Sequence, residues 1–198
     1  MPMGTLLQAS LPKDLAALPD LLPRGDLWVF GYASLMWAPD FRYAERHTAL
    51  VHGFHRSLCV YSHRYRGTPE RPGLVMGLCR GGSCWGVAFR VEQRLARRTL
   101  RILWEREMLN HVYEPRVIPV RIGRRTVPAL TFVADPAHAQ FTGRLSVAQT
   151  ARMVAQGCGE RGENRHYLEQ TVAHMEALGL REGHLHEVLR AVQKLCGC

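Results

Sequence analysis

The sequence lacks any long apolar run, and this absence excludes a membrane-spanning helix. No stretch of the 198 residues approaches the roughly 20 consecutive apolar positions that such a helix needs. Residues 1–25 also contain no basic segment followed by a continuous apolar core, so we expect no signal peptide. The sequence therefore predicts a cytoplasmic protein with no membrane partner.

Motifs for metal, cofactor or covalent chemistry are also missing. The sequence has no Cys-x-x-Cys pair and no Gly-x-Ser-x-Gly motif, and its six cysteines are dispersed through apolar segments, which favours reduced thiols. His52 and His55 lie in strand-like sequence, where residues three apart point to opposite faces. The segment 81–83 lacks the lysine and the following helix of a phosphate-binding loop. We therefore expect no metal site and no phosphate-binding loop.

Acidic residues are scarce relative to basic ones, which leaves a net charge of +9. Such a charge favours an acidic partner, either nucleic acid or a small anionic substrate. The arginines are dispersed and are not interleaved with aromatic residues in a regular motif. Charge alone therefore leaves both classes of partner open, and the sequence assigns no oligomeric state.

What the sequence does contain is enough apolar material for one core, since 46% of its residues are hydrophobic. We expect a lead-in over 1–25, with a short helical turn over 15–22, and a single domain over 26–198. Strand-like segments alternate with one helix and are followed by further helices. The expected strands are 27–30, 49–62, 74–78, 84–91, 117–122 and 126–133, and the expected helices are 91–109, 146–157, 167–178 and 185–195. This order predicts an α+β fold, with a small mixed sheet or barrel flanked by helices.

Three local signals support these boundaries. Gly81 and Gly82 predict a hairpin turn over 80–83, because paired glycines suit turns with positive φ. The segment 123–125 predicts a second hairpin turn. Ser146 followed by Gln149 has the spacing of a capping box at the start of a helix.

Glu107 is the most informative single residue. The residues three, four and seven positions before it on the expected helix are apolar, namely Trp104, Leu103 and Leu100. Glu107 therefore shares the face that should be buried, whereas Glu105 follows arginines at helical spacing and should face solvent. A carboxylate on an apolar face is costly unless it is paired or used. A catalytic role and a structural salt bridge to an arginine both fit this pattern.

The segment 31–35 is a second candidate. A strand that ends in small residues exposes consecutive backbone N–H groups, and these can hold a carboxylate without a cationic side chain. An ordinary strand-to-loop turn fits the same residues.

Short motifs follow one another through most of the sequence, roughly over 27–195. The first is 28–37 with Pro39 and Phe41. The others, in order, are 52–56, 62–63, 66–75, 86–89, 103–108, Tyr113 with Pro115, 162–168, Thr171 and 178–179. Each motif is short, but so many in one order are specific, and together they resemble the motifs of the ChaC-like γ-glutamylcyclotransferases.

The resemblance implies a small β-barrel with flanking helices, no cofactor, and conversion of glutathione to 5-oxoproline and cysteinylglycine. Glu107 matches the catalytic glutamate. The substrate-binding loop matches Tyr32, Ala33, Ser34 and Leu35, whose backbone amides would take the α-carboxylate of the γ-glutamyl group. Arg56, Arg66, Arg71 and Tyr113 complete the expected substrate contacts, with the arginines drawing in the glycine carboxylate. No nucleic-acid partner is expected on this interpretation.

Two positions depart from the family pattern. Ala33 stands where the family usually has glycine, and a positive φ there would cost about 1–3 kcal/mol of strain. With a negative φ the added methyl group would be tolerated. His166 stands where an acidic residue is common.

Two alternatives remain open. The same site could act on other γ-glutamyl amino acids or amines. A protein of another class, a basic nucleic-acid-binding protein or a regulator of cation transport, would also fit the charge, although it leaves Glu107 unexplained.

Overall fold

The computed structural model describes residues 25–197, which form two compact units. Unit 1 contains residues 25–56 and 78–135, and unit 2 contains residues 57–77 and 136–197. The expected lead-in, with its helical turn over 15–22, lies outside the described residues except for Gly25. The assignment of 26–198 to one domain stays a prediction. Across residues 25–197, no helix combines the length and the apolar character needed to cross a membrane.

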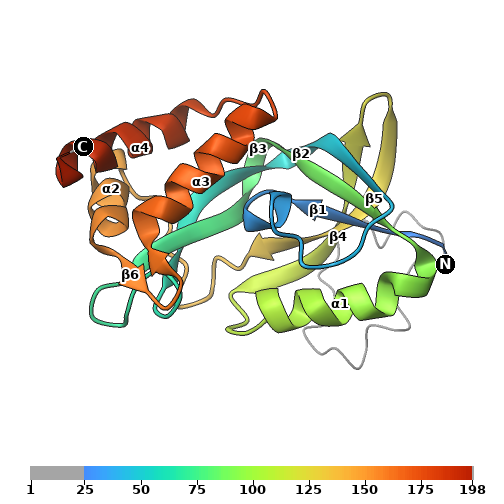
Figure 1. Ribbon diagram of the computed structural model, residues 1–198, viewed down its shortest axis with the longest axis horizontal. Helices are drawn as coiled ribbons and strands as arrows, with labels where there is room; N and C mark the ends of the chain where they lie inside the picture. The colour runs from blue at the N-terminus through green and yellow to red at the C-terminus, as the bar shows by residue number, and fades with distance from the viewer. Residues whose placement is uncertain (1–24, 198) are drawn as a thin grey trace. The chain divides into compact units, whose positions relative to one another are not determined.

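Unit 1 is built around a closed β-barrel (Figure 1). Its strands are β1 (Leu27–Gly31), β2 (Glu45–Ser62), β3 (Gly73–Val91), β4 (Tyr113–Ile122) and β5 (Arg125–Ala134). The order around the barrel is β1-β3-β2-β4-β5, and a parallel pairing of Val29 with Leu130 closes it. Together with the helices, this barrel confirms the predicted α+β fold.

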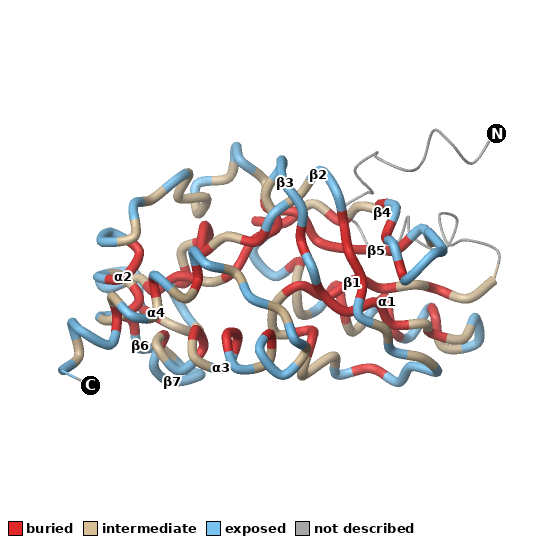
Figure 2. The backbone as a smooth tube through the Cα atoms, turned by 90° about the horizontal axis from the view of Figure 1, so that it is seen from above, coloured by how far each residue is buried: buried red, intermediate tan, exposed pale blue. Residues whose placement is uncertain are grey.

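Large apolar side chains fill the barrel, and Figure 2 shows buried residues running along its strands. Closing a small barrel leaves an interior that is only wide enough for side chains, so the strands bury most of one face. The residues with almost no exposure include Phe30, Phe89, Ile118 and Phe132. The site described below is therefore carried by a packed scaffold.

One sequence prediction about this sheet is wrong. The expected hairpin turn over 80–83 does not form, because β3 runs without interruption from Gly73 to Val91 beside β2. Gly81 and Gly82 do have positive φ, 94° and 74°. Instead of reversing the chain, they sit inside the strand, as glycines at a bulge do. His55 of β2 lies opposite, with Nδ1 3.0 Å from the Gly81 carbonyl oxygen.

The other two local signals are confirmed. β4 and β5 form a hairpin in which Ile122 pairs with Arg125 and Gly123 has φ of 57°. Ser146 caps the next helix, with its Oγ accepting from the Gln149 N–H at 3.3 Å. The Gln149 side chain accepts from the Ser146 N–H at 3.0 Å, which completes the capping box.

Helix α1 (Gln93–Glu107) packs on the barrel through its apolar face. The Trp104 ring contacts the Phe132 ring of β5 at 5.7 Å between centroids, in an edge-to-face arrangement. The helix begins against Asp26, whose Oδ1 accepts from the Gln93 N–H at 2.9 Å. A carboxylate there satisfies one of the helix's first N–H groups and favours its positive end.

Asp26 also belongs to a charged network on the barrel wall. Arg90 donates to Asp26 and, at 2.8 Å, to Glu45 Oε1. The hydrogen bond from Arg90, followed by that from the Gln93 N–H, holds the pKa of Asp26 below its usual value. The hydrogen bond with His47, followed by that from Arg90, likewise lowers the pKa of Glu45.

We expect Asp26→Asn to lower the melting temperature at neutral pH and to matter less in acid. A carboxyl whose pKa is lower in the folded protein stabilises it above the unfolded-state pKa, and this contribution disappears as the pH falls through the folded-state pKa. The difference in melting temperature between the wild type and Asp26→Asn should therefore shrink below about pH 4. Circular dichroism melts between pH 7 and pH 3 measure it. Glu187→Gln, at an exposed position, is the control, and a difference for Asp26→Asn that stays constant with pH would contradict the assignment.

Unit 2 is mainly helical. Helices α2 (Val147–Gln156), α3 (Asn164–Ala177) and α4 (Gly183–Cys196) pack against one another in all three pairs. A two-stranded sheet, β6 (Cys158–Gly159) with β7 (Gly162–Glu163), lies between α2 and α3 in the chain. The helices meet through apolar residues such as Leu168, Met175 and Val188. The last two predicted helices are confirmed, including the end of α3 before Gly179.

The loop over 63–72 is fixed within unit 2 by close backbone packing. A Cβ on Gly157 would lie 2.5 Å from the Arg66 carbonyl oxygen, and a Cβ on Gly73 would lie 2.8 Å from Asn164 Oδ1. Asn164 is fully buried, and its side chain pairs with one residue of β3. Its Oδ1 accepts from the Leu74 N–H at 2.6 Å and its Nδ2 donates to the Leu74 carbonyl at 2.7 Å. Glycines and one amide thus join α3 to the start of β3.

Asn164→Asp should lower the free energy of unfolding by about 3 kcal/mol, because it removes a buried donor and leaves a carboxylate against the Leu74 carbonyl. Urea denaturation measures the change. Asn110→Asp, which makes the same replacement at an exposed position, should change the free energy of unfolding by less than about 0.5 kcal/mol. Equal effects of the two variants would show that the Asn164 pairing contributes nothing special.

Candidate active site

The loop that leaves β1 forms the 3-10 helix η3 (Ser34–Met36). The Met36 N–H donates to the Ala33 carbonyl at 2.7 Å, while the first N–H groups of a helix have no acceptor within it. The turn is tight, since a Cβ on Gly31 would lie 2.7 Å from the Leu35 Cβ. Glycine is therefore required at the end of β1. Since Ser34 and Leu35 are the first two residues of η3, their N–H groups have no acceptor within this short helix.

Ala33 has φ of −138°, outside the left-handed region that favours glycine. Its methyl group therefore imposes no strain of the kind considered from the sequence. Of the two outcomes that the sequence allowed at this departure from the family pattern, the structure has the tolerated one.

Arg56, on β2, holds the beginning of the loop. Its side chain is buried, with Nε donating to the Tyr32 carbonyl and Nη2 donating to the Trp85 carbonyl at 2.6 Å. Tyr32 is itself buried, and its hydroxyl donates to the Phe132 carbonyl at 2.8 Å. These contacts give Arg56 and the Tyr32 hydroxyl structural roles. Their predicted contacts with the substrate stay predictions.

Arg106, near the end of α1, holds the rest of the loop. Its Nη2 donates to Ser34 Oγ at 2.8 Å, and its Nη1 donates to the Ala38 carbonyl and to Asp40 Oδ2, both at 2.5 Å. Arg46 adds a bond from Nη2 to the Met36 carbonyl at 3.2 Å. Three guanidinium groups, from β2 and α1, therefore bind the segment 32–40.

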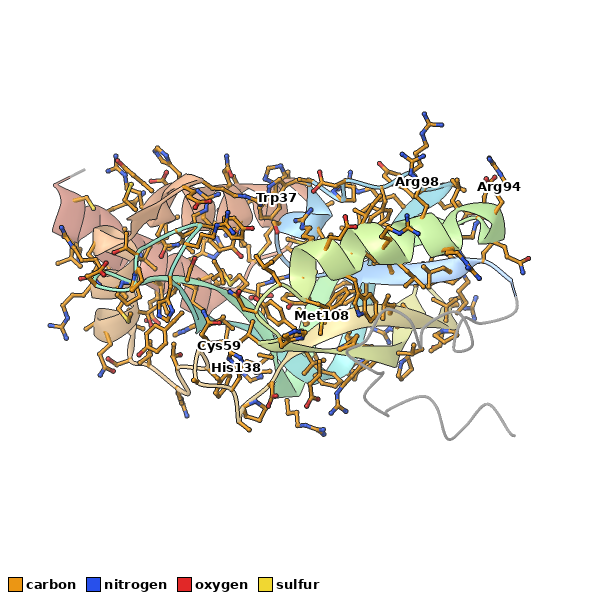
Figure 3. The ribbon with its side chains drawn as sticks, turned by 90° about the horizontal axis from the view of Figure 1, so that it is seen from below. Trp37, Cys59, Arg94, Arg98, Met108 and His138 are labelled. Carbon is orange, nitrogen blue, oxygen red and sulfur yellow. The ribbon has the colours of Figure 1, made fainter. Side chains whose placement is uncertain are left out.

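Glu107 is the last residue of α1, directly before Met108 (Figure 3). The predicted buried face is confirmed, since Leu100, Leu103 and Trp104 are all buried. The Glu107 side chain is 17% exposed, and its Oε1 lies 3.0 Å from Arg106 Nε. The salt bridge offered as the alternative is therefore present. The catalytic role of Glu107 stays a prediction.

The remaining predicted residues lie in different places. Tyr113 is buried at the start of β4, where it pairs with Ala134, in unit 1 with Glu107. Arg66 and Arg71 belong to unit 2. Arg71 is exposed. The substrate contacts expected for these three residues stay predictions.

Arg66 is anchored within its own unit. Its Nη1 donates to the Arg161 carbonyl at 2.6 Å and to the Glu163 carbonyl at 3.2 Å, and its guanidinium lies 5.4 Å from the centroid of the Tyr167 ring. Burial lowers the pKa of Arg66 from its ordinary value, by removing water from the charged form.

Sequence reasoning missed Arg106 and Asp40. Neighbouring residues on a helix do not normally face each other, so spacing gave no reason to pair Arg106 with Glu107. They meet at the end of the helix, where Arg106 Nε lies 3.0 Å from Glu107 Oε1. Asp40 has φ of 60°, which is uncommon for a residue other than glycine, and no sequence pattern announces it.

Within residues 25–197, no cluster of three or more His, Cys, Asp or Glu side chains could hold a metal ion. The five cysteines of this range are thiols rather than disulfides, as expected from their distribution.

Comparisons with known proteins find similar sequences. A family model described as ChaC-like protein matches residues 27–195. A protein of Escherichia coli (strain K12) named glutathione-specific gamma-glutamylcyclotransferase is 35% identical over 188 residues, covering 94% of this chain and 80% of its own. The human protein named glutathione-specific gamma-glutamylcyclotransferase 1 is 29% identical over 188 residues, covering 89% of this chain and 85% of its own.

The fold is also shared with a solved structure. The crystal structure of a selenomethionine-labelled γ-glutamylcyclotransferase specific to glutathione, from yeast, has a TM-score of 0.80 to this chain. It is 21% identical in sequence, and the match covers 86% of this chain and 97% of the yeast protein.

Proposed function

This chain belongs to the ChaC-like protein family, and from that premise we propose that it is a glutathione-specific γ-glutamylcyclotransferase acting in the cytoplasm. The reaction converts glutathione to 5-oxoproline and cysteinylglycine. The proposal is supported by relatives that carry this name and match most of the chain. The observation that carries it is the Glu107 carboxylate, mostly buried and joined through Arg106 to the loop after β1.

The reaction needs a base and groups that hold the substrate in its reactive conformation, and it needs no cofactor. The α-amine of the γ-glutamyl group attacks the carbonyl carbon of its own γ-amide, a new C–N bond closes the five-membered ring, and the old amide C–N bond breaks. The amine must first lose a proton, and the departing amine of cysteinylglycine must gain one. Because the attack is intramolecular, an enzyme that holds the substrate in a folded conformation removes much of the activation barrier.

Glu107 suits the proton transfers in this proposal. A carboxylate within reach of the substrate's ammonium can accept its proton and later return it to the departing amine. We assign the Glu107 carboxylate to the proton of the substrate's ammonium. The N–H groups of Ser34 and Leu35, at the start of η3, are the proposed ligands of the α-carboxylate. The guanidinium groups around 32–40 add positive charge beside that anion.

Glu107→Gln should retain the fold and glutathione binding but lose at least about 100-fold in turnover, the usual scale for removing a general base. Release of 5-oxoproline measures turnover, and calorimetry measures binding. The matched control is Glu105→Gln on the same helix, whose side chain is exposed and whose turnover should stay within about 2-fold of the wild type. Near-normal turnover of Glu107→Gln would contradict the role given to Glu107.

The substrate is tested separately. We expect 5-oxoproline release from glutathione to exceed release from γ-glutamylalanine by at least about 10-fold in kcat/KM, since glutathione is one residue longer and carries its terminal carboxylate farther from the γ-glutamyl group, where the expected arginine contacts would bind it. Both products are quantified by mass spectrometry under the same conditions. Equal or reversed efficiencies would favour the alternative, a cyclotransferase for other γ-glutamyl compounds, and would leave the role of Glu107 intact.

A further inference from the structure

We propose that Arg106 is the positioning residue of this site, which fixes the Glu107 carboxylate and the loop after β1 in one geometry. The inference rests on the proposed function, because it concerns the same reaction. Arg106 makes no contact with the reacting atoms in this proposal. It acts through the groups that do.

One guanidinium reaches acceptors on both sides of the site. Its Nε lies 3.0 Å from Glu107 Oε1, on the helix that supplies the base. Its Nη2 donates to Ser34 Oγ in the binding loop at 2.8 Å. The guanidinium is planar and rigid, so two of its nitrogens hold these two groups at a fixed separation.

The third nitrogen secures the far end of the loop. Nη1 donates to the Ala38 carbonyl and to the Asp40 carboxylate, both at 2.5 Å. Asp40 adopts φ of 60°, a conformation that most residues avoid and that aspartate tolerates better than most. The loop is thus turned so that a backbone carbonyl and a side chain converge on the same nitrogen.

Burial makes these bonds effective. The side chains of Arg106 and Glu107 are only 15% and 17% exposed. Hydrogen bonds to charged groups are stronger where water is partly excluded, and a charge that loses its partner there is costly. Arg106 therefore determines where the carboxylate points.

The other arginines of α1 differ from Arg106. Arg94 and Arg98 project away from the helix into solvent (Figure 3). Arg94 pairs with Glu92, its near neighbour in the chain. Arg98 is exposed on the same helix and is the matched control for Arg106.

The test compares Arg106→Lys and Arg106→Gln with Arg98→Gln. Lysine keeps the charge but its three donors share one terminal nitrogen, so it cannot hold Glu107 and the loop through nitrogens at a fixed separation. Both Arg106 variants should lose at least about 10-fold in kcat and show a raised KM for glutathione, since small misplacements of a base cost that much. Arg98→Gln should stay within about 2-fold in both constants. Activities are normalised to the folded fraction, from circular dichroism.

A double-mutant cycle separates positioning from general weakening of the fold. If Arg106 acts through Glu107, adding Arg106→Gln to Glu107→Gln should reduce the residual kcat by less than about 3-fold. Kcat values of Arg106→Lys and Arg106→Gln within about 2-fold of the wild type would overturn the proposal, as would full additivity in the cycle. If the wild type releases no 5-oxoproline from glutathione, the proposed function fails instead, and the two failures are thereby distinguished.

Discussion

The site depends on guanidinium groups that hold the loop after β1. The segment 32–40 follows a barrel strand and contains only one short turn of helix. Arg56 holds its start from the barrel, and Arg106 holds its middle and its end from α1. A guanidinium can bind a carbonyl, a hydroxyl and a carboxylate at once in a fixed planar arrangement, whereas the donors of lysine share one nitrogen at the end of a flexible chain. The barrel is rigid, and the arginines restrain the loop relative to it.

These contacts give part of the positive charge a structural role. A net charge of +9 suggests an acidic macromolecule as one class of partner. Several of the arginines instead have partners within the fold. Arg90 joins Asp26 to Glu45 on the barrel wall, and Arg66 donates to two backbone carbonyls in unit 2. The charge around 32–40 is thus both structural and suited to a small anion.

Local sequence patterns correctly predicted features that depend on residues close together in the chain. The capping box at Ser146 and the turn at Gly123 depend on residues within a few positions, and both are confirmed. The buried face of α1, and with it Glu107, followed from helical spacing. The prediction of a turn at Gly81 and Gly82 was wrong because residues with positive φ occur both in turns and in bulges. Here β3 continues past both glycines and pairs with β2, which a local pattern does not reveal. Arg106 was missed because its partners lie on a loop far away in the sequence.

Some residues of the family motifs report on the fold, and others report on the binding loop. Gly73 and Asn164 belong to the matching motifs, and the structure shows them in close packing and in a buried pairing with β3. Their presence therefore reports the fold more than the reaction. Ala33 is the reverse case, because it departs from the pattern inside the loop itself. Since its φ is negative, the backbone needs no glycine there. The departure is thus compatible with the proposed chemistry, which depends on the backbone of this loop and on the carboxylate of Glu107.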